Sequence, residues 1–100
     1  MSDEKVVLVA RLKVKEEGVE TIKATALALV GPSRAEEGCI NYDIHQSIED
    51  ETVFVWHETW ANKTVLDEHF QKPYFTDFFA KVNEFAAEPP QITLTRMISE

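Results

Sequence analysis

The chain has 100 residues, the size of one domain, and its apolar content of 44% is ordinary for a globular protein. Acidic residues outnumber basic ones by 18 to 10, and the net charge of -8 argues against binding to nucleic acid or to an anionic membrane. Cys39 is the only cysteine, which excludes an intrachain disulfide, and the early apolar run over residues 6–10 is too short for a signal peptide or a membrane span. We expect a single domain over residues 1–100, with its core over about 6–98, in the cytoplasm.

The first half of the chain predicts a strand, a helix and a second strand. Residues 6–14 are rich in β-branched side chains, which is typical of a strand. Apolar residues then recur at helical spacing over residues 19–30, and Gly31-Pro32 is expected to kink or interrupt this helix. Residues 39–47 alternate between polar and apolar side chains and predict a second strand.

The second half predicts a strand, a helix in two parts and a last strand. Residues 52–60 are strongly β-prone and form a predicted hairpin with the preceding strand. Asn62 is a good N-cap for the next helix, and Pro73 suits the first turn of its second part. Residues 91–98 predict the last strand. The second part of the helix has an unusually aromatic apolar face made of Phe75, Phe78, Phe79, Val82, Phe85 and Ala86.

This β-α-β-β-α-β order predicts an α+β fold, the ferredoxin-like split βαββαβ sandwich, with helices on one face of a four-stranded antiparallel sheet. The strands over residues 6–14 and 52–60 carry apolar side chains on both faces, for example Val53 and Val55 on one and Phe54 and Trp56 on the other. A strand of this kind is normally buried on both faces. We therefore expect a homodimer, in which a second copy of the chain covers the second face.

His69 is the first candidate catalytic residue. Its spacing from Val65 places it on or beside the buried side of the predicted helix. One interpretation is a core histidine bonded to a backbone carbonyl. The other is a polar group that lines a pocket and orients or deprotonates an acidic substrate near neutral pH.

Glu58 is the second candidate, because it lies between Trp56 and Trp60 on one side of its strand. A carboxylate between two indoles is poorly hydrated, which raises its pKa unless a donor compensates. The alternative is a structural ion pair, for which Arg11, Arg34, Arg96 and His69 are the available partners.

The sequence predicts no metal site. The chain has three histidines but no HxH or HxxxH spacing, and neighbouring residues such as His57 and Glu58 point to opposite faces of a strand. It also lacks a glycine-rich phosphate loop. Cys39 is interpreted as a small packed residue rather than a nucleophile.

Three segments in this order, RAEEGCINY from Arg34, HETW from His57 and DEHFQKPYF from Asp67, resemble the antibiotic biosynthesis monooxygenase family, most closely its quinol monooxygenase-like branch. The resemblance extends over nearly the whole chain. It implies small proteins that pair their sheets into a dimeric α+β barrel and oxygenate phenolic or quinol substrates without flavin, metal or haem. The positions that match the family pattern are Glu37, Gly38, Cys39, Tyr42, Glu58, Trp60 and His69.

The resemblance to this family disfavours haem degradation, since the asparagine, tryptophan and histidine of the haem-degrading branch align here with Ala10, His69 and Phe79. It implies instead a cofactor-independent monooxygenase in which His69 takes or shares the substrate proton and Glu58 fixes its charge or orientation. An isomerase of a small oxygenated metabolite and a dimeric, non-catalytic ligand-binding module are the alternatives. The candidate substrate-binding residues, for a small aromatic or quinone-like molecule, are Trp60, Tyr42, Asn41, Arg34 and Phe79. The hairpin register leaves open whether Asn41 or Tyr42 shares a face with Glu58.

Overall fold

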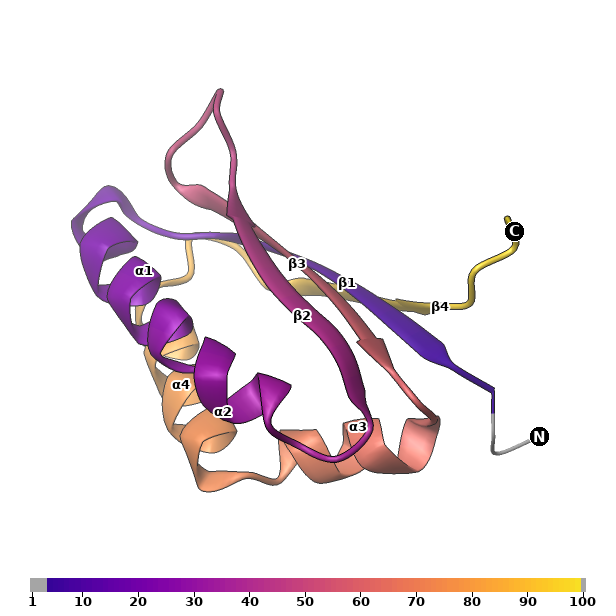
Figure 1. Ribbon diagram of the computed structural model, residues 1–100. Coiled ribbons are helices and arrows are strands. Elements are labelled where there is room, and N and C mark those ends of the chain that lie inside the picture. The colour runs from indigo at the N-terminus through magenta and orange to yellow at the C-terminus, as the bar shows by residue number, and fades with distance from the viewer. Residues whose placement is uncertain (1–3, 100) are drawn as a thin grey trace.

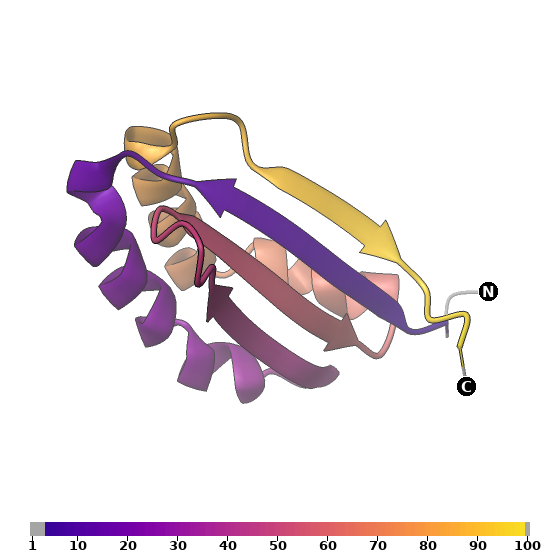
Figure 2. The same ribbon diagram turned by 90° about the horizontal axis from the view of Figure 1, so that it is seen from above.

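A sheet of antiparallel strands forms one layer of the molecule. The computed structural model describes residues 4–99, and in this range four strands lie in the order β2-β3-β1-β4. The strands are β1 (Val6–Lys13), β2 (Cys39–Gln46), β3 (Val53–Trp60) and β4 (Gln91–Thr95). Figure 2, which views the molecule from above, shows β1 and β3 between the two edge strands.

Helices cover one face of this sheet (Figure 1). They are the short 3-10 helix η1 (Glu16–Gly18) and the α-helices α1 (Val19–Ala28), α2 (Val30–Arg34), α3 (Lys63–Phe70) and α4 (Pro73–Phe85). None of the helices in residues 4–99 is long and apolar enough to cross a membrane. The order of the elements and the antiparallel sheet confirm the predicted α+β, ferredoxin-like fold.

Prolines divide each of the two predicted helices. Pro32 has no N–H to donate to the carbonyl of Ala28, and α1 ends at Ala28. The predicted helix is interrupted, but at Leu29 rather than at Gly31-Pro32, which both lie within α2. Lys72 has an extended backbone (φ -66°, ψ 140°), which is the conformation favoured before proline, so that α3 and α4 are separate helices and Pro73 begins the second.

The last strand is shorter than predicted. It ends at Thr95 rather than Ile98, because Thr95 pairs with Val7 and only Val6 of β1 remains beyond that pair. The first strand also ends one residue before the predicted boundary, at Lys13. Both differences arise where one strand extends past the end of its neighbour and loses its pairing partner. The hydrophobic pattern of a strand does not show where the neighbouring strand ends.

A bulge in β2 decides which of its residues face the helices. The register with β3 shifts between Cys39 and Asn41, and beyond the shift Tyr42 stands opposite Glu58. Opposite residues of an antiparallel pair share a face, and both of these side chains are buried on the helix side. Asn41 stands opposite Thr59 and belongs to the other face of the sheet.

The hydrophobic core lies between the sheet and the helices. Its largest buried members are Leu8, Leu12, Ile22, Leu29, Tyr42, Phe54, Trp56, Trp60, Leu66 and Phe78. No helix of residues 4–99 lies over the opposite face of the sheet (Figure 1), and Val9 on this face is 39% exposed. That a second copy of the chain covers this face stays a prediction.

Candidate active site

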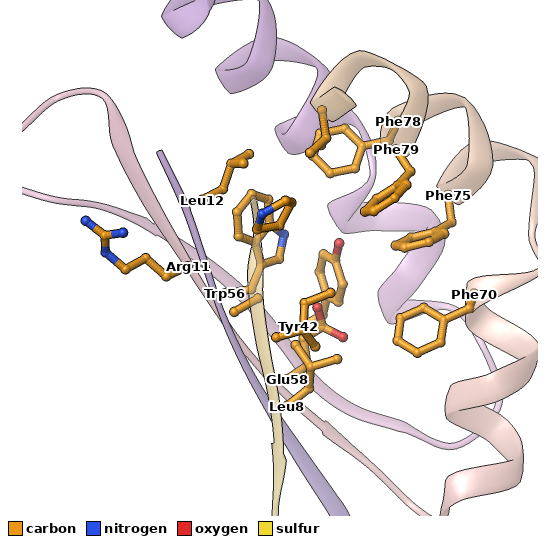
Figure 3. A pocket seen from close by; sticks show the side chains of 14 residues that line it. Leu8, Arg11, Leu12, Tyr42, Trp56, Glu58, Phe70, Phe75, Phe78 and Phe79 are labelled. Carbon is orange, nitrogen blue, oxygen red and sulfur yellow. The ribbon is translucent and has the colours of Figure 1, made fainter. Parts of the chain in front are cut away.

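An aromatic pocket opens between the helix-facing side of the sheet and the helices α3 and α4 (Figure 3). Its empty volume, counting the part open to solvent, is about 480 Å³. Six of its fourteen lining residues are aromatic, and aliphatic residues such as Leu8 and Val82 make up most of the rest. The aromatic side chains are Tyr42, Trp56, Phe70, Phe75, Phe78 and Phe79.

Glu58 brings a carboxyl group to this apolar pocket. Its side chain comes from the middle of β3, lines the pocket and is only 4% exposed. Burial raises the pKa of the Glu58 carboxyl to about 7, the negative charge of Glu36 adds to this, and a 2.9 Å hydrogen bond donated by Nε1 of Trp60 to Oε1 acts against it. A carboxyl group with this pKa can both accept and return a proton near neutral pH.

His69 is buried behind the pocket, and its ring is 1% exposed. Nδ1 lies 2.8 Å from Oε2 of Glu36, and the hydroxyl of Tyr74 donates to the same oxygen. A carboxylate only accepts hydrogen bonds, so Nδ1 of His69 is the donor in this pair. Nε2, the second ring nitrogen, is buried without a hydrogen-bond partner among the described residues.

Aromatic rings separate His69 from the pocket. The ring centre of His69 lies 4.7 Å from that of Trp60, 5.3 Å from Phe75 and 5.7 Å from Tyr42. Phe75 and Tyr42 themselves line the pocket, whereas His69 does not. The sequence predicted either a bond to a backbone carbonyl or a place in the pocket wall. The structure instead bonds His69 to a carboxylate, one layer behind that wall.

The start of α3 explains why His69 is buried. The side chain of Asn62 accepts a 3.0 Å hydrogen bond from the backbone N–H of Val65, which confirms the predicted N-cap. From this start, helical spacing turns Leu66 and His69 toward the core.

The other predicted substrate-binding residues divide into three groups. Tyr42 and Phe79 line the pocket, while Trp60 is fully buried and holds Glu58 through its indole N–H. Asn41 and Arg34 do not reach the pocket, since neither belongs to its lining and Asn41 lies on the opposite face of the sheet.

Asn41 and Arg34 instead share a carboxylate partner. Nδ2 of Asn41 lies 3.0 Å from Oδ2 of Asp43, and Nη2 of Arg34 lies 2.9 Å from Oδ1 of the same residue. The hydrogen bond from Asn41 and the contacts with Arg34 lower the pKa of Asp43. Nε of Arg34 also donates to the backbone oxygen of Tyr42, so this cluster braces the outer side of β2.

Sequence reasoning missed Glu36 and Tyr74. The family pattern points to the neighbouring Glu37, which is exposed, whereas the Glu36 side chain is only 7% exposed and reaches His69. In a loop, no periodicity of the sequence indicates which of two adjacent glutamates points into the protein. The contact depends on how the segment before β2 meets α3 in the folded chain.

The remaining polar groups offer no metal site. No cluster of three or more His, Cys, Asp or Glu side chains with a geometry suited to a metal ion occurs between residues 4 and 99. Burial, and the charges of Glu36 and Glu58, raise the pKa of the Cys39 thiol to about 11, so the thiol stays protonated at neutral pH.

Comparison with known proteins agrees with this picture. The chain is 35% identical over 92 residues to a Bacillus subtilis protein named "Putative monooxygenase YcnE", which covers 92% of this chain and 97% of that protein. It is also 33% identical over 96 residues to an uncharacterized protein of Synechocystis. This match covers 96% of the present chain but only 65% of the length of the Synechocystis protein. The structure of Rv0793 from Mycobacterium tuberculosis superimposes with a TM-score of 0.91 at 28% identity, covering 97% of this chain and 98% of that one.

A family model described as antibiotic biosynthesis monooxygenase matches residues 5–81, more than three quarters of the chain. The matched range includes the three segments that resemble the family, those beginning at Arg34, His57 and Asp67. The Bacillus subtilis relative matches this chain over 97% of its own length, whereas the Synechocystis relative is longer and matches over 65% of its length. The chain therefore belongs to the antibiotic biosynthesis monooxygenase family.

Proposed function

We propose that this protein is a monooxygenase that oxidises a small phenolic or quinol-type substrate with dioxygen and without an organic or metal cofactor. The observation that carries the proposal is the buried carboxyl of Glu58, which has a pKa of about 7 and lines a pocket of aromatic side chains. Aromatic walls suit a flat ring, and the carboxylate suits a hydroxyl group on that ring.

The reaction begins with the substrate proton. The Glu58 carboxylate accepts it from the ring hydroxyl, and the resulting phenolate can pass one electron to dioxygen. Recombination of the two radicals forms a ring peroxide anion, which takes the proton back from Glu58 and becomes the hydroperoxide. The hydroperoxide then loses its terminal hydroxyl and the hydrogen of the same ring carbon as water and leaves a ring carbonyl. For a hydroquinone with a free ring position, one dioxygen yields one hydroxyquinone and one water, so the substrate itself supplies all the electrons.

His69 is the second candidate base. Its hydrogen bond to Glu36 leaves the lone pair of Nε2 free of protein partners among the described residues. Because the rings of Tyr42 and Phe75 stand between His69 and the pocket, His69 meets a substrate only when one of these rings turns. In the arrangement described here, Glu58 is the group that meets the substrate directly.

Oxygen consumption tests this proposal. With a panel of small quinols, the protein should consume one dioxygen per quinol, and labelled oxygen should appear in the product. Glu58→Gln, which keeps the shape of the side chain but cannot take a proton, should lower turnover by ~10²–10⁴-fold. Substrate turnover without oxygen uptake would indicate the isomerase instead. Tight binding of these ring compounds without turnover would indicate a binding module.

A further inference from the structure

The hydrogen bond between Trp60 and Glu58 fixes where a proton can reside on this carboxyl group. An indole N–H can only donate, so Oε1 of Glu58 must act as an acceptor whether or not the group is protonated. In the acid form the carbonyl oxygen is the better acceptor, so this bond favours Oε1 as the carbonyl oxygen and Oε2 as the oxygen that carries the proton. Among the described residues no hydrogen bond to Oε2 is found, and the group belongs to the pocket lining (Figure 3).

Few other polar groups compete for a ligand in this pocket. Figure 3 shows the guanidinium of Arg11 directed away from the cavity, and it pairs with Glu88 at 3.1 Å. On β1, Leu8 stands directly opposite Glu58, and α4 presents only phenylalanine rings and Val82 to the pocket. The titratable groups around Glu58 are Tyr42 and Cys39 of β2, Glu36 of the segment before β2, and His69 of α3.

We propose that Glu58 sorts ligands by the direction of their hydrogen bond: its carboxylate accepts from a ring hydroxyl, and its acid form donates from Oε2 to a ring carbonyl. The reduced substrate and the oxidised product then bind to opposite protonation states of one residue. This inference rests on the proposed function in one respect, that the natural ligands are hydroxylated rings and the carbonyl compounds made from them.

Both forms of Glu58 are populated near neutral pH, since burial raises its pKa to about 7. Burial also raises the pKa of Tyr42 and that of Cys39, so both keep their protons in this range. Binding of a hydroxyl ligand should therefore strengthen as pH rises, and binding of a carbonyl ligand should weaken. Because the reaction returns the proton, Glu58 is again a carboxylate after turnover. In this form it cannot donate to the carbonyl product, which is released, and it can accept from the next substrate.

Three compounds with the same methylated ring test this inference without turnover: tetramethylphenol, its methyl ether and duroquinone. Their dissociation constants can be measured in oxygen-free buffer from quenching of tryptophan fluorescence, because Trp56 lines the pocket. Between about pH 5.5 and about pH 8.5 the carboxylate fraction of Glu58 rises from about 3% to about 97%. Tetramethylphenol should bind up to about 30-fold more tightly at the higher pH and duroquinone correspondingly more weakly, while the ether should gain nothing.

Two variants assign the effect. Glu58→Gln keeps an acceptor for Trp60 and presents an amide N–H to the pocket, so it should bind duroquinone at both pH values and abolish the pH dependence of both ligands. His69→Gln replaces the imidazole that packs against Trp60, and it should retain the opposite trends. Trends that survive in Glu58→Gln, or that vanish in His69→Gln, would overturn the assignment.

The wild-type protein provides a check that does not depend on a variant folding. Difference infrared spectroscopy at neutral pH should show the carbonyl stretch of the protonated Glu58 weaken when tetramethylphenol binds and grow when duroquinone binds. Equal pH trends for the two ligands would overturn the sorting role and leave the proposed monooxygenase untouched. Failure of all three rings to bind would count against the proposed function itself.

Discussion

Among single residues, Glu58 and His69 both contact Trp60 but differ in what they can reach. Glu58 bonds to the indole N–H and lines the pocket, whereas His69 lies against the indole ring and bonds to Glu36 behind the wall. A catalytic base must come within hydrogen-bond distance of its substrate. The two residues are therefore expected to respond differently to substitution.

His69→Gln separates catalysis from packing. If His69 acts as a base after the pocket wall moves, turnover on a quinol should fall by ~10²–10⁴-fold, because glutamine cannot take a proton near neutral pH. If it only ties α3 to Glu36, the loss should appear as ~1–3 kcal/mol of unfolding free energy, with turnover per folded molecule kept. His57→Gln, an exposed position on the other face, is the matched control. Wild-type turnover in His69→Gln would show that His69 has no catalytic role.

The sequence can identify Glu58 and His69 because each is a titratable residue in an apolar pattern. It cannot identify Glu36, which is 33 positions from His69 and meets it only after the helices have packed. Nor can the sequence show that Phe75 lines the pocket while His69 lies behind it. Helical spacing indicates which side of a helix a residue occupies, but not whether another side chain covers it.

Among the elements, the start of β2 depends on a glycine that the family pattern also contains. Gly38 has a φ of 90°, in the region that disfavours side chains, and its carbonyl accepts a 2.8 Å hydrogen bond from the backbone N–H of Ala61. A Cβ atom at this position would come within 2.8 Å of the Val65 side chain on α3. The close approach brings β2 and α3 together beside Glu36 and His69. The order of these elements was predictable, but the bulge that follows Gly38 was not, because the hairpin pattern permits either register.

Gly38→Ala should lower the unfolding free energy by ~1–3 kcal/mol, owing to the positive φ and the contact with Val65. Gly31→Ala is the matched control. Gly31 lies in α2 and has open space where a Cβ would be placed, so alanine there should be neutral or stabilising by about 0.5–1 kcal/mol. Thermal or urea unfolding of the two variants measures the difference. Equal stabilities would contradict the role given to Gly38.

For the whole molecule, the uncovered face of the sheet is the main feature that one chain leaves unexplained. The pairing of β1 with β3 places Val7 opposite Thr59 and Arg11 opposite Val55, so the valines of both strands share this face. All five residues of β4 are exposed as well. The sequence predicted a face with valines in each strand, since alternation assigns side chains to faces, but it could not show that the two valine pairs share one face. Polar side chains such as Arg11, His57 and Thr59 lie among these valines.

A homodimer formed through this face is the expected assembly, because no helix of residues 4–99 covers the face and its valines favour association with a second copy. Size-exclusion chromatography with light scattering at micromolar concentration should give twice the mass of the chain. Substituting Val7 and Val9 together with aspartate should convert the protein to a monomer or unfold it, because charges would then be buried in the interface. Ile48→Asp, in the fully exposed turn between β2 and β3, is the matched control and should remain dimeric. A wild-type protein that is monomeric and fully stable would contradict this assembly, as would a Val7 and Val9 variant that stays dimeric.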